Sequence, residues 1–361
     1  MADAPHVLLV GPLPPPSGGM ANQTRQLKRL LEGEGVRVSL VQTNAPYRPA
    51  WVESLRGIRA IFRLVPYRRD LARGCAAADV VHVMANSGWA WHLFAAPAIR
   101  IARRKGRPVV VNYRGGLARE FLAKSSASVK ATLRGTRLVV PSEFLREVFA
   151  GHGVHADIIP NVVDTATFRP ADASRAFRAD APHVVIARNL ESIYGIDVGL
   201  EALALLRRDA PGLTASIAGS GPDRAALEDQ ARRLGLADCV RFTGRLDVAG
   251  MVALYQSADL VLNPVRADNT PNSVLEALAC GVPVVSTNVG GVPYLVQDRQ
   301  TAMLAPTESP SGLAAAMVEV LRDPALRQGL IDRGLARARA CAWPVVRDQW
   351  LHAYRTAERT N

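Results

Sequence analysis

Lysine, cysteine and long apolar runs are all scarce in this sequence of 361 residues. It has four lysines, all between Lys28 and Lys130, so the second half has none. The four cysteines are too far apart to predict a zinc site or a redox pair, which fits a reducing cytosol: Cys75, Cys239, Cys280 and Cys341. No apolar run approaches the roughly 18 residues of a membrane-spanning helix. The N-terminal residues lack the basic lead and apolar core of a signal peptide.

Apolar residues make up 48% of the chain, which excludes a mainly disordered protein and leaves room for two domains. Short apolar runs alternate with helical patterns in the first half of the chain, and the alternation starts again in the second half. This pattern predicts parallel sheets covered on both faces by helices. The expected strands are 6–10, 36–40, 79–84, 108–111 and 138–142, then 183–187, 214–218, 240–244, 260–264 and 284–287. We expect one domain over residues 1–167, a second over 168–342, and a terminal segment, 343–361, that crosses back to the first.

Positive charge is concentrated in the first half. Residues 1–170 hold 24 Lys and Arg against 11 Asp and Glu, a net +13, and residues 171–361 hold 20 against 21, a net −1. Such a surface favours anionic membranes, acidic acceptors or nucleic acid, and the lack of a nucleic-acid motif ranks nucleic acid last. Residues 56–73 mix six arginines with apolar side chains. They predict either a helix lying on an anionic membrane or an ordinary helix with a solvated basic face.

The most informative stretch runs from Asp268 to Pro283. It predicts a loop after strand 260–264 and a helix that begins near Ser273, capped by Asn272 or Ser273. Gly281 would end this helix. The amides of Asn272, Ser273 and Val274 would then favour a phosphate. Asp268 before the helix and Glu276 within it supply carboxylates for sugar or ribose hydroxyls.

This pattern resembles glycosyltransferase family 4, also called group 1, whose members are retaining enzymes of the GT-B fold. The family motif is an acidic residue followed, after seven other residues, by a Glu. Asp268 and Glu276 match this spacing, although the first acidic residue of the motif is usually Glu. Gly281-Val282-Pro283 matches the Gly-x-Pro that follows this motif in the family. The resemblance implies two doubly wound Rossmann-like domains facing across a cleft. It also implies transfer from a nucleotide-diphosphate sugar without cofactor or metal, and the sequence has no Asp-x-Asp motif.

Further donor-side positions follow from the resemblance. Arg188 matches an Arg that grips the diphosphate, whereas Tyr194 replaces the family's Lys. Gly18 and Gly19 match a glycine pair that faces the donor phosphates. Gly219 and Arg245 lie where strands end, and Arg245 or Arg266 could add charge. The absence of lysine from the second half excludes the phosphorylases of this fold, which hold pyridoxal phosphate on a lysine there.

On the acceptor side, the expected residues are His82, Asn86 and Arg114. His82 fits a packed strand residue as well as a cleft residue. Many family members have a His where Arg114 stands, so this chain loses a possible acid or base and gains a cation suited to an anionic group. We expect Arg188, Asp268 and Arg114 to be catalytic. The acceptor would be a glycan or a lipid-linked molecule, met in the cytoplasm or at the inner membrane face.

Two other functions stay open. An epimerase of the same fold would use the donor site without an acceptor, but it would need carboxylate or His bases in the first domain, where few are found. A non-catalytic subunit that binds a sugar nucleotide would explain the changes at Arg114, Tyr194 and Tyr294. The retention of Arg188, Asp268 and Glu276 argues against such a subunit.

Overall fold

The computed structural model describes residues 5–15, 18–47, 49–55, 59–172 and 177–357. Four predicted segments lie partly outside these ranges: the N-terminal residues at 1–4, the basic segment at 56–58, the start of the second domain at 173–176, and the terminal segment at 358–361. The chain forms two compact units. Unit 1 comprises Met1–Val162 and Val346–Asn361, and unit 2 comprises Val163–Val345. The predicted domain limits at 167/168 and 342/343 stay predictions.

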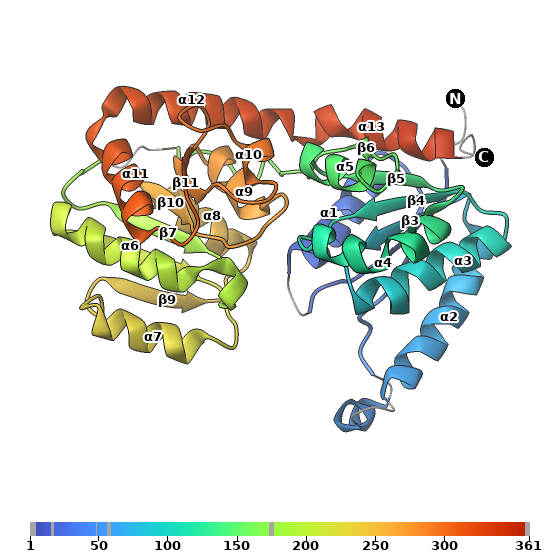
Figure 1. Cartoon of the computed structure of the whole chain (residues 1–361). Helices are drawn as coiled ribbons and strands as arrows, with labels where there is room; N and C mark the ends of the chain where they lie inside the picture. Colours follow the sequence, from blue (N-terminus) through green and yellow to red (C-terminus); the bar gives the residue numbers. More distant parts are fainter. Residues whose placement is uncertain (1–4, 16–17, 48, 56–58, 173–176, 358–361) are drawn as a thin grey trace. The chain divides into compact units, whose positions relative to one another are not determined.

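Unit 1 is built on a parallel sheet in the order β2-β1-β3-β4-β5-β6. Figure 1 labels strands β3 to β6 of this sheet. Its strands are β1 (Val7–Gly11), β2 (Val38–Gln42), β3 (Val80–Ala85), β4 (Val109–Tyr113), β5 (Arg137–Val140) and β6 (Asp157–Ile158). Every residue of β1, β3 and β4 is buried, because helices cover both faces of the sheet. Consecutive apolar residues such as Val7 to Val10 are therefore what these strands require.

The helical segments of unit 1 are α1 (Gly19–Gly33), η1 (Ala50–Ser54), α2 (Arg59–Ala77), η2 (Trp91–Ala95), α3 (Ala96–Arg104), α4 (Ala118–Leu133) and α5 (Glu143–Ala150). The basic segment forms α2, with Pro66 inside the helix. The last helix, α13 (Trp343–Thr356), packs on unit 1 from Val346 onward. Its Tyr354 and Trp350 rings lie against His82 of β3.

Unit 2 has a second parallel sheet, in the order β12-β11-β10-β7-β8-β9. Its strands are β7 (His183–Ala187), β8 (Thr214–Ala218), β9 (Val240–Gly244), β10 (Leu260–Asn263), β11 (Val284–Thr287) and β12 (Met303–Ala305). The helices are η3 (Ser192–Tyr194), α6 (Ile196–Asp209), α7 (Arg224–Arg233), α8 (Val248–Gln256), α9 (Asn272–Ala279), α10 (Val292–Leu295), α11 (Pro310–Arg322) and α12 (Pro324–Ala340). The prediction of two doubly wound α/β domains is confirmed.

The strand orders decide where ligands can bind in each unit. In unit 2 the chain builds outward from β7 through β8 to β9, then returns to place β10 on the other side of β7. The loops after β7 and β10 therefore diverge at the carboxyl edge of the sheet, the usual ligand position in such folds. In unit 1 the same reversal lies between β1 and β3.

Candidate functional site

Arg188 is the first residue after β7 and lies at the reversal point of unit 2. Its Nε donates to Oδ1 of Asn263 at the end of β10, over 2.7 Å. Its Nη2 lies 2.9 Å from Oδ2 of Asp268. That contact lacks hydrogen-bond alignment, so Nη2 is a buried donor without a hydrogen-bond partner. The guanidinium is thus fixed in place while part of its donor capacity is unused.

Asp268 is held by its own loop and by the loop after β11. Its Oδ1 accepts from the backbone N–H of Asn269 over 2.6 Å. The N–H of Gly291 donates to the Asp268 carbonyl over 3.0 Å. Gly290 has a φ of +57°, and a Cβ there would stand 2.2 Å from the same carbonyl oxygen. The Gly290-Gly291 pair thus allows the two loops to approach closely enough to position Asp268.

Glu276 lies on α9, facing Tyr255 of α8. The Tyr255 hydroxyl donates to Oε2 of Glu276 over 3.2 Å. Burial raises the pKa of Glu276 to about 7, although the Tyr255 hydrogen bond and the Arg188 charge lower it. Glu276 therefore changes protonation near neutral pH, which is unusual for a glutamate.

The predicted cap of α9 is wrong. The residue before the helix is Pro271, and no side chain caps the first turn. Asn272 already has helical geometry, so its side chain cannot take the N-cap position, and Ser273 lies one residue deeper. Val274 is buried. The Val274 N–H already donates to the Pro271 carbonyl over 3.2 Å. Of the three expected amides, those of Asn272 and Ser273 therefore suit an anion at this helix start better than that of Val274.

Two other predicted donor residues, Tyr194 and Gly219, contact Arg188, and a third, Arg245, contacts the loop after β8. The Tyr194 ring of η3 lies 5.4 Å from the Arg188 guanidinium carbon. Gly219 has a φ of +153°, and a Cβ there would stand 1.8 Å from the Arg188 carbonyl oxygen. Gly219 therefore allows the loops after β7 and β8 to touch. Arg245 is exposed, and its Nε donates to Ser220 Oγ over 2.5 Å.

Arg266 is poorly suited to the diphosphate role considered above. Both of its terminal nitrogens donate to the Asp197 carboxylate, over 2.8 and 2.7 Å. Its Nε donates to Glu308 over 2.5 Å. These hydrogen bonds raise the pKa of Arg266 and use its charge within the protein.

Sequence reasoning missed Asn263 and Tyr255, which hold Arg188 and Glu276. Asn263 is itself fixed, because its Nδ2 donates to Ser286 Oγ on β11 over 2.7 Å. The sequence did contain a signal for Asn263, because it is a polar residue at the end of the apolar run 260–262. Tyr255 gave none, since its partner lies 21 positions away on another helix.

In unit 1, His82 is fully buried on β3. Its Nδ1 shares a 2.9 Å hydrogen bond with the Tyr354 hydroxyl, and its Nε2 lies 3.3 Å from Nδ2 of Asn112. Burial lowers the pKa of His82 to about 3, and the Arg114 charge adds to the effect. His82 is thus a neutral interior residue without access to an acceptor, so the packed alternative is the better description.

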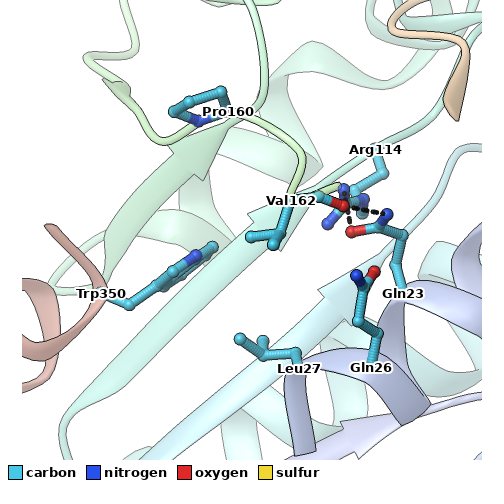
Figure 2. A pocket seen from close by; sticks show the side chains of 7 residues that line it. All are labelled: Gln23, Gln26, Leu27, Arg114, Pro160, Val162 and Trp350. Carbon is cyan, nitrogen blue, oxygen red and sulfur yellow. Dashed lines mark hydrogen bonds between the residues drawn. The ribbon is translucent and has the colours of Figure 1, made fainter. Parts of the chain in front are cut away.

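Arg114 follows β4, where its N–H donates to the Ala85 carbonyl at the end of β3 over 2.9 Å. Its Nη2 donates to Oε1 of Gln23 over 3.2 Å and to Oδ1 of Asn161. Burial lowers the pKa of Arg114 to about 10. It lines a small pocket with residues of α1, the chain near Pro160 and α13 (Figure 2): Gln23, Gln26, Leu27, Pro160, Val162 and Trp350.

The other predicted residues of unit 1 lie at the same edge of the sheet. Gly18 directly precedes α1 and Gly19 is its first residue, so the pair lies at a helix start. A Cβ at Gly18 would meet nothing within 4 Å, so packing within unit 1 does not require glycine there. Asn86 is exposed after β3, and its Oδ1 accepts from the N–H of Ser87 over 2.8 Å.

Within the described ranges, no group of three His, Cys, Asp or Glu side chains could hold a metal ion. None of the helices in those ranges is both long enough and apolar enough to cross a membrane.

Two family models match most of the chain between them. Residues 17–167 match the model described as Glycosyltransferase Family 4, and residues 181–323 match Glycosyl transferases group 1. The D-inositol 3-phosphate glycosyltransferase of Segniliparus rotundus is 31% identical over 229 residues, 61% of this chain and 51% of that protein. The glycogen synthase of Mycobacterium tuberculosis is 32% identical over 266 residues, 69% of this chain and 62% of that protein. The chain thus spans about half to three fifths of these relatives.

Solved structures share the fold over nearly the whole chain. Anabaena HepE in complex with UDP and glucose aligns with a TM-score of 0.75 and 19% identity, over 98% of this chain and all of HepE. The sucrose-phosphate synthase of Thermosynechococcus elongatus aligns with a TM-score of 0.78 and 20% identity, over 99% of this chain and all of that one.

Proposed function

This chain belongs to the group 1 glycosyltransferases of family 4, and from that premise we propose that it transfers a sugar from a nucleotide-diphosphate sugar to an acceptor. The observation that carries the proposal is the arrangement at the reversal point of unit 2. There, the buried and incompletely bonded Nη2 of Arg188 lies beside Asp268, in the unit that also carries the uncapped start of α9.

The leaving diphosphate gains negative charge as the sugar departs. Arg188 would donate to it as a guanidinium suited to phosphate oxygens. The first-turn amides of α9 would add donors and the positive end of a helix dipole. Because Asn263 and Asp268 hold Arg188 in place beforehand, little reorganisation is needed during the reaction.

The two carboxylates would hold hydroxyl groups. Asp268 is committed to Arg188 and to Asn269, but each carboxylate oxygen has a second lone pair for a hydroxyl of the donated sugar. Glu276 would accept from the ribose hydroxyls when it is ionised. Gly219 would act by allowing the loop contact that positions Arg188. Tyr194 would lie beside Arg188, and Arg245 would add positive charge near the loop after β8.

Relatives support the substrate class. HepE is described with UDP and with glucose, which supports a nucleotide donor here. D-inositol 3-phosphate and glycogen, the acceptors implied by the names of two relatives, suggest a small phosphorylated polyol or a glycan. Retention at the anomeric carbon, and transfer without a metal, are part of the proposal through the family resemblance.

We place the acceptor at an anionic membrane surface, on the cytoplasmic side. Large exposed apolar side chains lie in η1, directly after it, and in the first half of α2: Trp51, Leu55, Ile61, Phe62 and Val65. The exposed arginines Arg68, Arg69 and Arg73 follow on α2. Apolar side chains flanked by arginines suit the boundary between lipid headgroups and acyl chains.

The test is turnover of a panel of sugar nucleotides, followed by mass spectrometry, with and without membrane extract. Acceptor-dependent release of a nucleoside diphosphate, lost in Glu276→Ala, is the expected result. Conversion of the donor to an isomer without acceptor would establish the epimerase instead. Tight donor binding without turnover in any extract would establish a binding subunit.

A further inference from the structure

The Arg114 guanidinium is a partly buried charge that no carboxylate of the described residues neutralises. Its hydrogen-bond acceptors are two neutral amides, those of Gln23 and Asn161. Only burial lowers its pKa, with no opposing carboxylate. Buried cations in proteins are normally paired, so the charge itself needs an explanation.

Holding α1 and Asn161 together does not require a charge. Gln23 is already oriented by a second contact, because its Nε2 donates to the Val162 carbonyl over 3.1 Å. A neutral donor opposite Gln23 and Asn161 would satisfy both amide oxygens without the cost of burying a charge. The positive charge of Arg114 also reaches His82, whose pKa it helps to lower. Its field is therefore not cancelled locally.

Two donor groups of Arg114 are not used within the described residues. Only Nη2 is used by Gln23 and Asn161, and Nε and Nη1 form no hydrogen bond with the described residues. Arg114 follows β4, whose neighbour β3 borders the reversal point of the unit 1 sheet. It lines the same pocket as Gln26 and the apolar side chains of Leu27 and Trp350 (Figure 2).

We propose that Arg114 is an anion-binding residue that receives a phosphate or carboxylate group carried by a substrate. A planar guanidinium with free donors matches the paired oxygens of either group. The anion would supply the missing counter-charge. That the anion belongs to a substrate of sugar transfer rests on the proposed function, whereas anion binding itself does not.

Binding of inorganic phosphate to the 361-residue chain, at constant ionic strength, tests the site directly. An Arg188→Gln background removes the main phosphate site of unit 2 in every sample. On that background, Arg114→Gln is expected to weaken phosphate binding about tenfold, in line with the loss of a charged hydrogen bond. Arg114→Lys keeps the charge and should lose less. Arg100→Gln, an exposed arginine of α3 outside the pocket, should change nothing.

Two further comparisons assign the source of the anion. The first compares binding of glucose 6-phosphate with binding of glucose, which tests a charged acceptor. The second compares binding of UDP-glucuronate with binding of UDP-glucose, which tests a charged donor sugar. The charged member should be preferred in one pair, and that preference should vanish in Arg114→Gln. Equal phosphate affinity with Arg114 and with Gln at this position overturns the proposal. If phosphate binding depends on Arg114 but the chain with Arg188 intact binds no sugar nucleotide, the proposed function is contradicted and the anion site is not.

Discussion

The Arg188 guanidinium connects the parts of the proposed donor site, because it touches Asn263, Asp268 and Tyr194 at once. The family resemblance predicted Arg188, Asp268 and Glu276 from local motifs. It could not predict the side chains that fix them, since Asn263 lies 75 positions from Arg188 and Tyr255 lies 21 from Glu276. Such contacts depend on how strands and helices pack, which no local motif encodes.

Glu276 gives a pH-dependent stability of predictable sign. Because burial raises its pKa from 4.5 to about 7, the folded chain binds more protons than the unfolded chain between these values. This contribution to stability is therefore present at low pH and is lost as the pH rises to about 7, by at most about 1.4 kcal/mol per pH unit. Glu276→Gln should remove this slope, as measured by denaturant unfolding from pH 4.5 to 8.

Glu228→Gln is the matched control, since it removes an exposed carboxylate from α7 of the same unit. The same slope in wild type and Glu276→Gln would contradict the account of Glu276. Donor binding should weaken in Glu276→Gln above pH 7, where the ionised carboxylate would otherwise accept from ribose.

Loop contacts between neighbouring elements place the site residues. Strands β7, β8, β9 and β11 have the predicted limits. The start of α9 was predicted less well. A short polar residue is a good N-cap, but Pro271 has the extended backbone required before the helix and takes the position instead.

Gly219→Ala should disturb the contact between the loops after β7 and β8. A Cβ there collides with the Arg188 carbonyl at 1.8 Å, so backbone must move and the cost should be about 3 kcal/mol or more. Gly235→Ala is the control, because its φ is +71° but its Cβ would have open space. It should cost about 1–2 kcal/mol. Equal costs in denaturant unfolding would show that the loop contact is unimportant.

The contact between α13 and β3 is a second element-scale test. Tyr354→Phe leaves Nδ1 of the fully buried His82 without its 2.9 Å partner. An unsatisfied buried polar group should cost about 1–3 kcal/mol of unfolding free energy. A variant as stable as wild type in urea would mean that the hydrogen bond contributes little.

At the scale of the whole molecule, the two halves of the chain carry very different charge, +13 in residues 1–170 and −1 in the rest. A basic half with exposed apolar side chains should bind anionic vesicles but not neutral ones. Co-sedimentation with phosphatidylglycerol vesicles should fall as salt increases, because screening weakens the attraction. Ile61→Ser with Val65→Ser should reduce binding, and Val345→Ser, an exposed residue of α13, is the control. Equal binding to neutral and anionic vesicles would contradict the claim that charge attraction contributes to membrane binding.

The measurement that tests the account most directly is UDP binding by titration calorimetry to wild type, Arg188→Gln and Arg322→Gln. Arg322 is an exposed arginine of unit 2, paired with Asp209, so its variant removes the same charge away from the site. We predict that wild type and Arg322→Gln bind UDP alike, and that Arg188→Gln binds it roughly tenfold to a hundredfold more weakly. Equal UDP affinity in wild type and Arg188→Gln would contradict the central claim that Arg188 holds the donor diphosphate.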